Sequence, residues 1–325
     1  MNEFGEESIG HETDISAQDW SACRQHLQRT HDAWASICGR VNLYLLIDTR
    51  GYQQLDQQLA TMHGLRYASL WRETGLQDYP DVAPYLIAFE PESFAESDGS
   101  QHQLLRQIWQ EAVPLHAVTW IWSPYAFDEI EAHFRRYVIY ALPGGRAYYL
   151  FFFDNHVLPR LRKVWTTEQS QRFVAPCFQM SYRDRRADEV VWRNDESAYV
   201  SHDSYALRLS DAQHSHLLDL GYPDKLALKF RESMGSSLSH LSDVDLHHLV
   251  VGQMERARRY GIEEEDALSH YVATGILIAS DFDEHPLVQS NLERAGRGDM
   301  TIDEALAAVD DETWAAIRAR HQFAL

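Results

Sequence analysis

The sequence predicts an α/β N-terminal lobe, with a mixed sheet, flanking helices and a β-hairpin, followed by an all-α C-terminal lobe. Short apolar runs typical of strands alternate with helical stretches in the first part of the chain, whereas nearly every later segment is helical. The length of 325 residues suits two or three domains of roughly 100–200 residues each. We therefore predict an α/β domain at residues 1–195 and a helical domain at 196–325, with a linker near 195–210.

The first lobe is predicted to begin with a helix, followed by short strands and a hairpin. A helix is expected from Ser16 to Cys38, because Ser16 and Asp19 form a capping-box pattern ahead of apolar residues at helical spacing. The apolar run 43–48 is typical of a strand buried on both faces. Gly144 and Gly145 stand between two strand-like runs and allow positive φ at both turn positions, which predicts a β-hairpin. Further strands are expected at 66–71, 83–89 and 115–122, and further helices at 52–62, 101–112 and 125–137.

The second lobe is predicted from helix-start and helix-stop signals. Ser242 with Asp245 forms an N-cap ahead of apolar residues at helical spacing, and Gly261 supplies the C-terminal stop. The acidic start of the stretch 263–279 suits the positive end of a helix dipole. Thr301 with Glu304 predicts another capping box.

Composition limits the classes of function. Hydrophobic residues make up 45% of the chain, which is too much apolar surface for a disordered protein. No apolar run is long enough for a membrane span, and the acidic N-terminus does not resemble a signal peptide, so we expect a cytoplasmic protein. Cys23, Cys38 and Cys177 form no metal or disulfide pattern. A net charge of -20 disfavours nucleic acid and anionic membranes as partners, and favours a protein partner.

Catalytic signatures are missing from the sequence, which contains no GxSxG, HExxH, P-loop or GxGxxG motif. Asp48 and Asp154 each end an apolar run, where α/β enzymes often place acids, but a carboxylate there also caps the following turn. His133 lies within a predicted helix and has no identified catalytic partner. Close histidine pairs point to different sides of a helix, so a shared metal is not expected. We predict no catalytic, cofactor or metal site.

One segment of this acidic protein is basic. Residues 160–186 carry seven cations against two acids, a net charge of +5. Such a patch suits an acidic partner surface, although it also suits pairing with the acidic tail of the same chain. The candidate partner-binding residues are Arg160, Arg162, Lys163, Arg183, Arg185 and Arg186.

Three sequence pieces occur in series with the order and approximate spacing of a known family. They are LYLLIDTRGY, DVAPYLIAFEP and WIWSPYAFDEIEAHFRRYVIYALPGGRAYYLFFFDNHVL. Over roughly residues 41–178 the chain resembles the type VI secretion effector chaperones, also called adaptors, long described as a domain of unknown function. The positions that match the family pattern are Asp48, Pro84, His133, Arg135, Arg136 and Asp154. Phe151 and Asn155 depart from it, because the family has arginine and proline there. The piece 252–272 and the element Phe282-Asp283 with Pro286 also resemble the family's helical region.

The resemblance implies a non-catalytic chaperone that binds a secreted effector protein, docks it on the trimeric VgrG spike protein and itself stays behind. We expect apolar grooves of the helical lobe to bind the effector and the basic segment to contact the spike. Two alternatives remain open. One is a hydrolase that uses Asp48, His133 and Asp154, and the other is an immunity protein whose acidic surface blocks a toxin.

Overall fold

The computed structural model describes residues 8–94, 99–194 and 206–322, and these form two compact units, residues 1–217 and 218–325. The first unit contains all the strands among the described residues, and the second is helical. This confirms the predicted fold class of an α/β lobe followed by an all-α lobe. No helix in the described part of the chain is long and apolar enough to cross a membrane.

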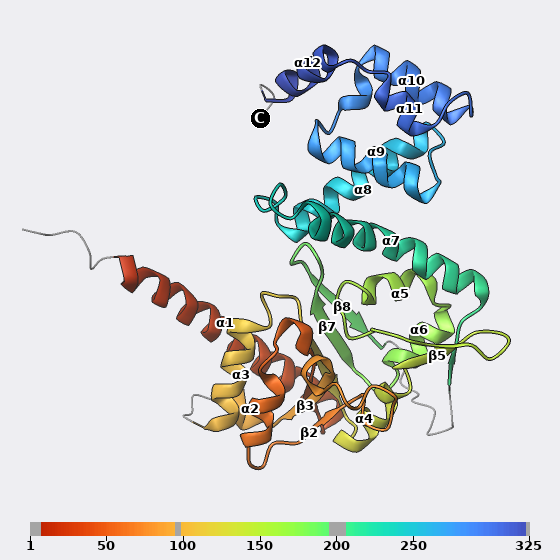
Figure 1. Ribbon diagram of the computed structural model, residues 1–325. Helices are drawn as coiled ribbons and strands as arrows, with labels where there is room; N and C mark the ends of the chain where they lie inside the picture. Colours follow the sequence, from red (N-terminus) through yellow and green to blue (C-terminus); the bar gives the residue numbers. More distant parts are fainter. Residues whose placement is uncertain (1–7, 95–98, 195–205, 323–325) are drawn as a thin grey trace, which may run out of the picture. The chain divides into compact units, whose positions relative to one another are not determined.

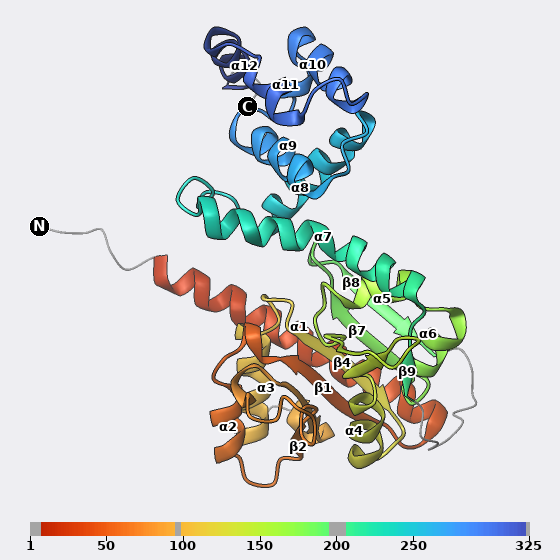
Figure 2. The ribbon, with the colours of Figure 1, turned by 45° about the vertical axis from the view of Figure 1, so that its right-hand side comes forward.

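A six-stranded sheet forms the centre of the first unit (Figures 1 and 2). Its strand order is β2-β3-β1-β4-β7-β8, and every neighbouring pair is antiparallel. The strands β1 and β4 are central and almost completely buried, as their continuous apolar runs predict. Their bounds are β1 Asn42–Asp48, β2 Tyr67–Ser69, β3 Pro84–Phe89, β4 Val118–Ser123, β7 Gln179–Arg183 and β8 Glu189–Arg193.

A smaller sheet has the order β6-β5-β9. β5 (Ile139–Ala141) and β6 (Ala147–Tyr149) form the predicted hairpin, in which Gly144 and Gly145 both have φ of 86°. β9 (Leu207–Arg208) pairs with β5 in parallel, so this small sheet is mixed. The apolar residues after β6 do not continue the strand.

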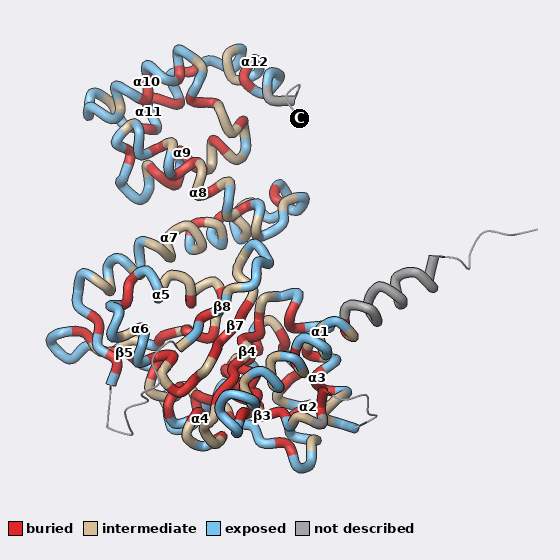
Figure 3. Tube along the Cα trace, turned by 180° about the vertical axis from the view of Figure 1, so that it is seen from behind, coloured by how far each residue is buried: buried red, intermediate tan, exposed pale blue. Residues whose placement is uncertain are grey.

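Helices cover both faces of the large sheet. α1 (Ser8–Cys38) and α3 (Ser100–Glu111) lie over the face that carries Trp120 and Trp122. α4 (Phe127–Arg135), α5 (Leu158–Val164) and α6 (Thr167–Val174) pack on the opposite face, where aromatic rings such as Phe173 and Trp192 fill the space. α2 (Leu55–Thr61) follows β1, as predicted. The buried core therefore lies on both sides of the sheet (Figure 3).

The second unit has its own hydrophobic core, formed around Tyr271 and Phe282. The buried carboxylate of Asp283 accepts hydrogen bonds from Arg256 and from the Tyr271 hydroxyl, which anchors the turn between two helices. Gly296 is required by close packing, because a Cβ there would lie 1.9 Å from the carbonyl oxygen of Tyr260. The helices are α7 Asp211–Met234, α8 Asp243–Arg259, α9 Glu265–Leu277, α10 Pro286–Gly296, α11 Ile302–Ala307 and α12 Asp311–Gln322, and α7 begins in the first unit.

Two local predictions are confirmed and two are wrong. Ser242 caps α8 and Thr301 with Glu304 forms a capping box at α11, as predicted. The first helix does not begin at Ser16, because it already runs from Ser8. Asp154 does not end a strand. β6 stops at Tyr149, and the aromatic residues that follow it lie in a turn that packs into the core. Most of the predicted linker, residues 195–205, lies outside the described residues.

The division between the two units follows Leu217, whereas the predicted domains are 1–195 and 196–325. β9 accounts for the difference, because it pairs with β5, and its residue Leu207 and the adjacent Leu209 are both 1% exposed in the core of the first unit. Gln213 also bonds back to the carbonyl of Val164, so the start of α7 belongs to that unit.

We predict that a fragment of residues 1–217 is more stable than a fragment of residues 1–195. The shorter fragment loses β9 and two buried leucines, each worth about 1.5–3 kcal/mol. Urea unfolding followed by tryptophan fluorescence compares the two fragments. Equal midpoints and slopes would show that β9 adds nothing to the α/β core.

Candidate functional site

Two of the residues that match the family pattern, Asp48 and Pro84, lie side by side where β1 ends. Asp48 is the last residue of β1, and it lies opposite Pro84 at the start of β3. The next residue, Thr49, begins a short 3-10 turn and donates its hydroxyl hydrogen to the carbonyl of Ala83 at 2.8 Å. The Asp48 side chain caps this turn by accepting the Arg50 backbone N–H at 3.1 Å. The end of β1 therefore places the Asp48 carboxylate next to the Arg50 guanidinium.

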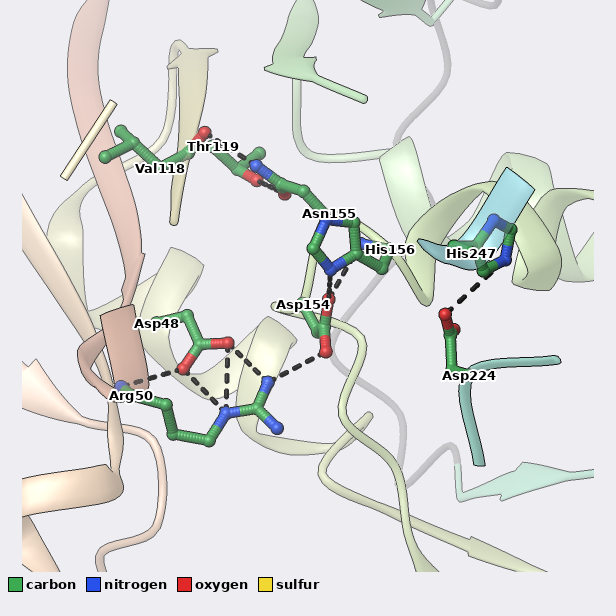
Figure 4. Close-up of polar contacts among 9 residues, drawn as sticks. All are labelled: Asp48, Arg50, Val118, Thr119, Asp154, Asn155, His156, Asp224 and His247. Carbon is green, nitrogen blue, oxygen red and sulfur yellow. Dashed lines mark hydrogen bonds and ion pairs between the residues drawn. The ribbon is translucent and has the colours of Figure 1, made fainter. Parts of the chain in front are cut away.

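Arg50 joins two carboxylates that are distant in sequence (Figure 4). Its Nε donates to both carboxylate oxygens of Asp48, at 2.9 and 3.1 Å, and its Nη2 donates to Asp154 Oδ2 at 2.9 Å. The Asp48 side chain is 10% exposed and that of Asp154 is 20% exposed. Burial acts to lower the pKa of Arg50, but the hydrogen bonds and charges of Asp48 and Asp154 outweigh it and raise that pKa, so Arg50 stays charged.

Aromatic rings cover the Arg50 guanidinium. Its central carbon lies 5.2 Å from the Phe151 ring centroid and 5.6 Å from that of Phe153, within the range of cation–π contacts. Trp71 contacts both rings edge-on. Phe151, the first of the two departures from the pattern of the family that the sequence resembles, thus supplies a ring to Arg50.

Asn155, the second departure from the family pattern, connects the same turn to the sheet. Its amide donates to the Val118 carbonyl at 3.0 Å, and its amide oxygen accepts the Thr119 hydroxyl at 2.8 Å (Figure 4). Asp154 Oδ1 accepts the His156 backbone N–H at 2.7 Å. Burial, then the charge of Arg185, lowers the pKa of His156 below its usual value, so its ring is neutral near pH 7. The turn before α5 is therefore held by two side chains, Asp154 through its bond to Arg50 and Asn155 through its bonds to β4.

His133 belongs to a different part of the unit. Its Nε2–H donates to the Phe173 carbonyl at 2.9 Å, which ties α4 to α6. Two residues further along α4, Arg135 pairs with Glu131 and with Glu73, and the charge of Arg136 acts on the His133 ring. The structure thus brings Asp48 and Asp154 together through Arg50 and places His133 between two helices. None of the contacts described for His133 involves either carboxylate.

The histidines that lie close together in the sequence contact different partners. His247 Nε2 lies 3.5 Å from Asp224 Oδ1 within the helical unit (Figure 4). His214 shares a hydrogen bond of 2.8 Å with the Tyr140 hydroxyl within the first unit. Within residues 8–94, 99–194 and 206–322, no group of three or more His, Cys, Asp or Glu side chains could hold a metal ion.

The predicted basic segment is divided between two elements. Arg160, Arg162 and Lys163 lie on α5, whereas Arg183 ends β7 and Arg185 and Arg186 occupy the turn before β8. Both groups are close to the His156 ring, since Arg160 and Arg185 each act on its pKa. Burial lowers the pKa of Arg160, an effect that the charge of Asp154 opposes.

Some of these cations contact aromatic rings, whereas others are exposed. Arg162 lies 4.8 Å from the Trp192 ring centroid, and Arg183 lies 5.5 Å from that of Trp109. Lys163 and Arg186 are exposed to solvent. These two therefore offer charge to a partner without a packing role that the structure describes.

A groove of about 750 Å³ lies on the opposite face of the sheet, beneath α1 and α3. Trp109, Trp120 and Trp122 line it, and Arg183 lies at its wall over Trp109. Cys23 also lines it, and burial raises the pKa of this thiol to about 12, so it is not a nucleophile at neutral pH. The sequence carries no local signal for this groove, because its lining comes from five separate elements.

Comparisons with known proteins identify one family. Residues 43–172 match the model of a family described as a domain of unknown function, DUF4123. The match runs from β1 into α6 and so includes Asp48, Arg50, His133 and Asp154. No curated protein and no solved structure matches the chain significantly.

We predict that Arg50→Met lowers the free energy of unfolding by about 2–3 kcal/mol. Two partly buried carboxylates then lose their shared cation, and the loss falls below the range for a fully buried pair because Arg50 is partly exposed. Chemical denaturation measures the loss. Arg146→Met, at an exposed hairpin position, is the matched control and should change stability by less than about 0.5 kcal/mol. A similar small change in both variants would contradict the role of Arg50.

We also predict that His133 makes the protein less stable in acid. Burial lowers the pKa of His133 from 6.5 to about 4 in the folded chain. Its contribution to stability is therefore complete above pH 6.5 and is lost as the pH falls from 6.5 towards 4. Between pH 7 and pH 5 this amounts to about 2 kcal/mol.

His133→Gln is the variant that tests this, because its amide can still donate to the Phe173 carbonyl but does not titrate. Unfolding free energies at pH 7 and pH 5 should differ less in this variant than in the wild type. Parallel pH profiles for the two proteins would mean that His133 does not titrate in this range.

Proposed function

We propose that the protein is a non-catalytic cytoplasmic adaptor, which binds a cognate type VI secretion effector and loads it onto the VgrG spike. Two findings support this: the sequence resembles the effector chaperones, and residues 43–172 match the DUF4123 model. The observation that carries the proposal is the Arg50 network. Asp48 and Asp154, the acids that an enzyme of this architecture would use, hold one arginine between them in a packed turn.

The hydrolase alternative requires His133 to act with these two carboxylates. His133 instead donates to a backbone carbonyl on α6, and burial keeps its ring neutral at physiological pH. The carboxylates are bonded to Arg50, and the histidine ring beside Asp154 is that of His156, whose Nδ1 lies 3.5 Å from Asp154 Oδ1, and not that of His133. The adaptor role needs no convergence of these groups, since it needs only surfaces that other proteins can bind.

In the proposed role the two units have different partners. The helical unit would bind the effector. A groove of about 710 Å³, lined by α7, the α8–α9 turn, α9, the end of α10 and the start of α11, is one surface for it. The α/β unit would contact the spike through the cations of α5 and the β7–β8 turn. Lys163 and Arg186 are exposed members of the basic set for which no aromatic contact is described, unlike Arg162.

We predict that Lys163→Glu combined with Arg186→Glu weakens spike binding about tenfold at low salt, equivalent to about 1.4 kcal/mol for two reversed rim charges. Effector binding should change less than twofold. Arg183 and Arg185 are left intact, because the first packs on Trp109 and the second acts on His156. Biolayer interferometry with purified VgrG and effector from the same gene cluster gives both affinities.

The matched control is Arg40→Glu with Arg146→Glu, which reverses two exposed charges elsewhere on the first unit. It should leave both affinities near the wild-type values. The difference between the variants should shrink at 500 mM salt, because exposed charges are screened. The proposal fails if neither VgrG nor any effector co-purifies with the wild-type chain.

A further inference from the structure

β8 is the outermost strand of the large sheet, beside β7. In an antiparallel pair, alternate residues exchange both backbone hydrogen bonds with the neighbouring strand. Two bonds fix which residues do so here. Asp184 N–H donates to the Asp188 carbonyl at 2.9 Å, and Asn194 N–H donates to the Phe178 carbonyl at 3.2 Å. Position 188 and position 194 therefore face β7, as do the even-numbered positions between them.

The odd-numbered residues of β8 consequently direct their backbone groups away from β7. These are Glu189, Val191 and Arg193, each with one N–H and one C=O. Among the described residues, none forms a hydrogen bond to these outward groups. The Val191 side chain is 39% exposed, which is high for valine in a strand. The described residues thus leave the outer edge of β8 unpaired.

A groove of about 600 Å³ runs beside this edge, between β8 and the helices α5 and α6. Its apolar lining comes from Val174, Val191 and Trp192, and its charged lining comes from Arg162 and Arg193. The guanidinium of Arg162 is held over the Trp192 ring. No acidic side chain of the described residues lines this groove, although the whole chain has a net charge of -20.

We propose that β8 is a docking edge for an extended acidic segment of a partner protein. The segment would pair with Glu189, Val191 and Arg193 as an added strand of about five residues, about 17 Å long. Apolar side chains on one face of the added strand would pack beside Val191, and carboxylates on its other face would approach Arg162, with Arg193 at the end of the edge. This inference rests on the proposed function and specifies the chemistry of one partner contact.

Charge decides which extended segment fits. The net charge of the protein repels an acidic strand from most of this surface. A groove whose charged lining residues are all arginines therefore directs such a strand to the β8 edge. A basic strand would leave Arg162 and Arg193 facing like charges. Backbone pairing gives affinity for a strand of any sequence. The two arginines make the edge favour an acidic strand over a basic one.

The test uses a fluorescein-labelled peptide, EVDVEVD, and the full-length protein in a fluorescence anisotropy titration. Two further peptides are compared with it: KVKVKVK, which reverses the charge, and EVDVEVD methylated on alternate backbone nitrogens, which cannot donate to a strand edge. We expect EVDVEVD to bind at least tenfold more tightly than either. Equal affinity for all three would overturn the inference.

Substitutions at the edge locate the binding site. Val191→Pro removes an outward N–H but no bond to β7, so it should weaken EVDVEVD binding at least tenfold. Val191→Thr, which keeps a β-branched side chain and the N–H, is the matched control and should bind within twofold of the wild type. Arg193→Glu should weaken binding of EVDVEVD and strengthen that of KVKVKVK.

Hydrogen exchange gives a readout that does not depend on the proline variant remaining folded. EVDVEVD should slow amide exchange at Val191 and Arg193 in the wild-type protein, and no protection there would overturn the inference. A wild-type dimer that Val191→Pro converts to a monomer in sedimentation velocity, without peptide binding, would assign the edge to a second copy and also overturn it. Co-purification of VgrG and effector with the wild type would still stand in both cases, so the two proposals fail separately.

Discussion

The ion pair network of Arg50 is the constraint on which the α/β unit depends. Arg50 lies at the end of β1, and its guanidinium bonds to Asp48 beside it and to Asp154, which is 104 residues further along the chain. A planar guanidinium can bond two carboxylates at once with fixed geometry, which an ammonium group cannot do. The bond therefore sets the position of the turn that begins α5. From there Asn155 connects the turn to β4, so the central strands and the basic helix share one anchor.

Local signals in the sequence were enough for most elements of the fold. Apolar runs predicted β1, β3 and β4, paired glycines predicted the hairpin, and capping residues predicted the starts of α8 and α11. The errors arise where tertiary contacts override the local pattern. The run Leu150–Phe153 looks like a strand because it is apolar, yet its rings are buried in a turn against Trp71 and Phe134. β9 has two residues and forms by pairing with residues 67 positions earlier, which no local pattern predicts.

The candidate site was predictable in its residues but not in its partners. Asp48 and Asp154 stood out because they end apolar runs, whereas Arg50 was missed, although an arginine two residues after a strand-ending aspartate is a signal for a charged turn. The basic segment was predicted as one patch from its charge. In the folded chain α6 and most of β7 lie between its two halves in sequence, and the guanidinium groups of Arg162 and Arg183 pack on the rings of Trp192 and Trp109. Sequence alone gives the charge of such a segment and cannot give its exposure.

The proposed adaptor role needs a contact that is specific but reversible, because the adaptor stays behind when its cargo leaves. A large apolar interface would favour a permanent complex. An edge strand of five residues beside a groove with two arginines is limited to a few backbone bonds and two rim charges, and exposed charges contribute only about 0.2–1 kcal/mol each. Such a contact sets the register and orientation of a partner while leaving the total affinity modest. The strong net negative charge elsewhere adds to this, because it repels acidic partners that miss the groove and so makes the small basic region decisive.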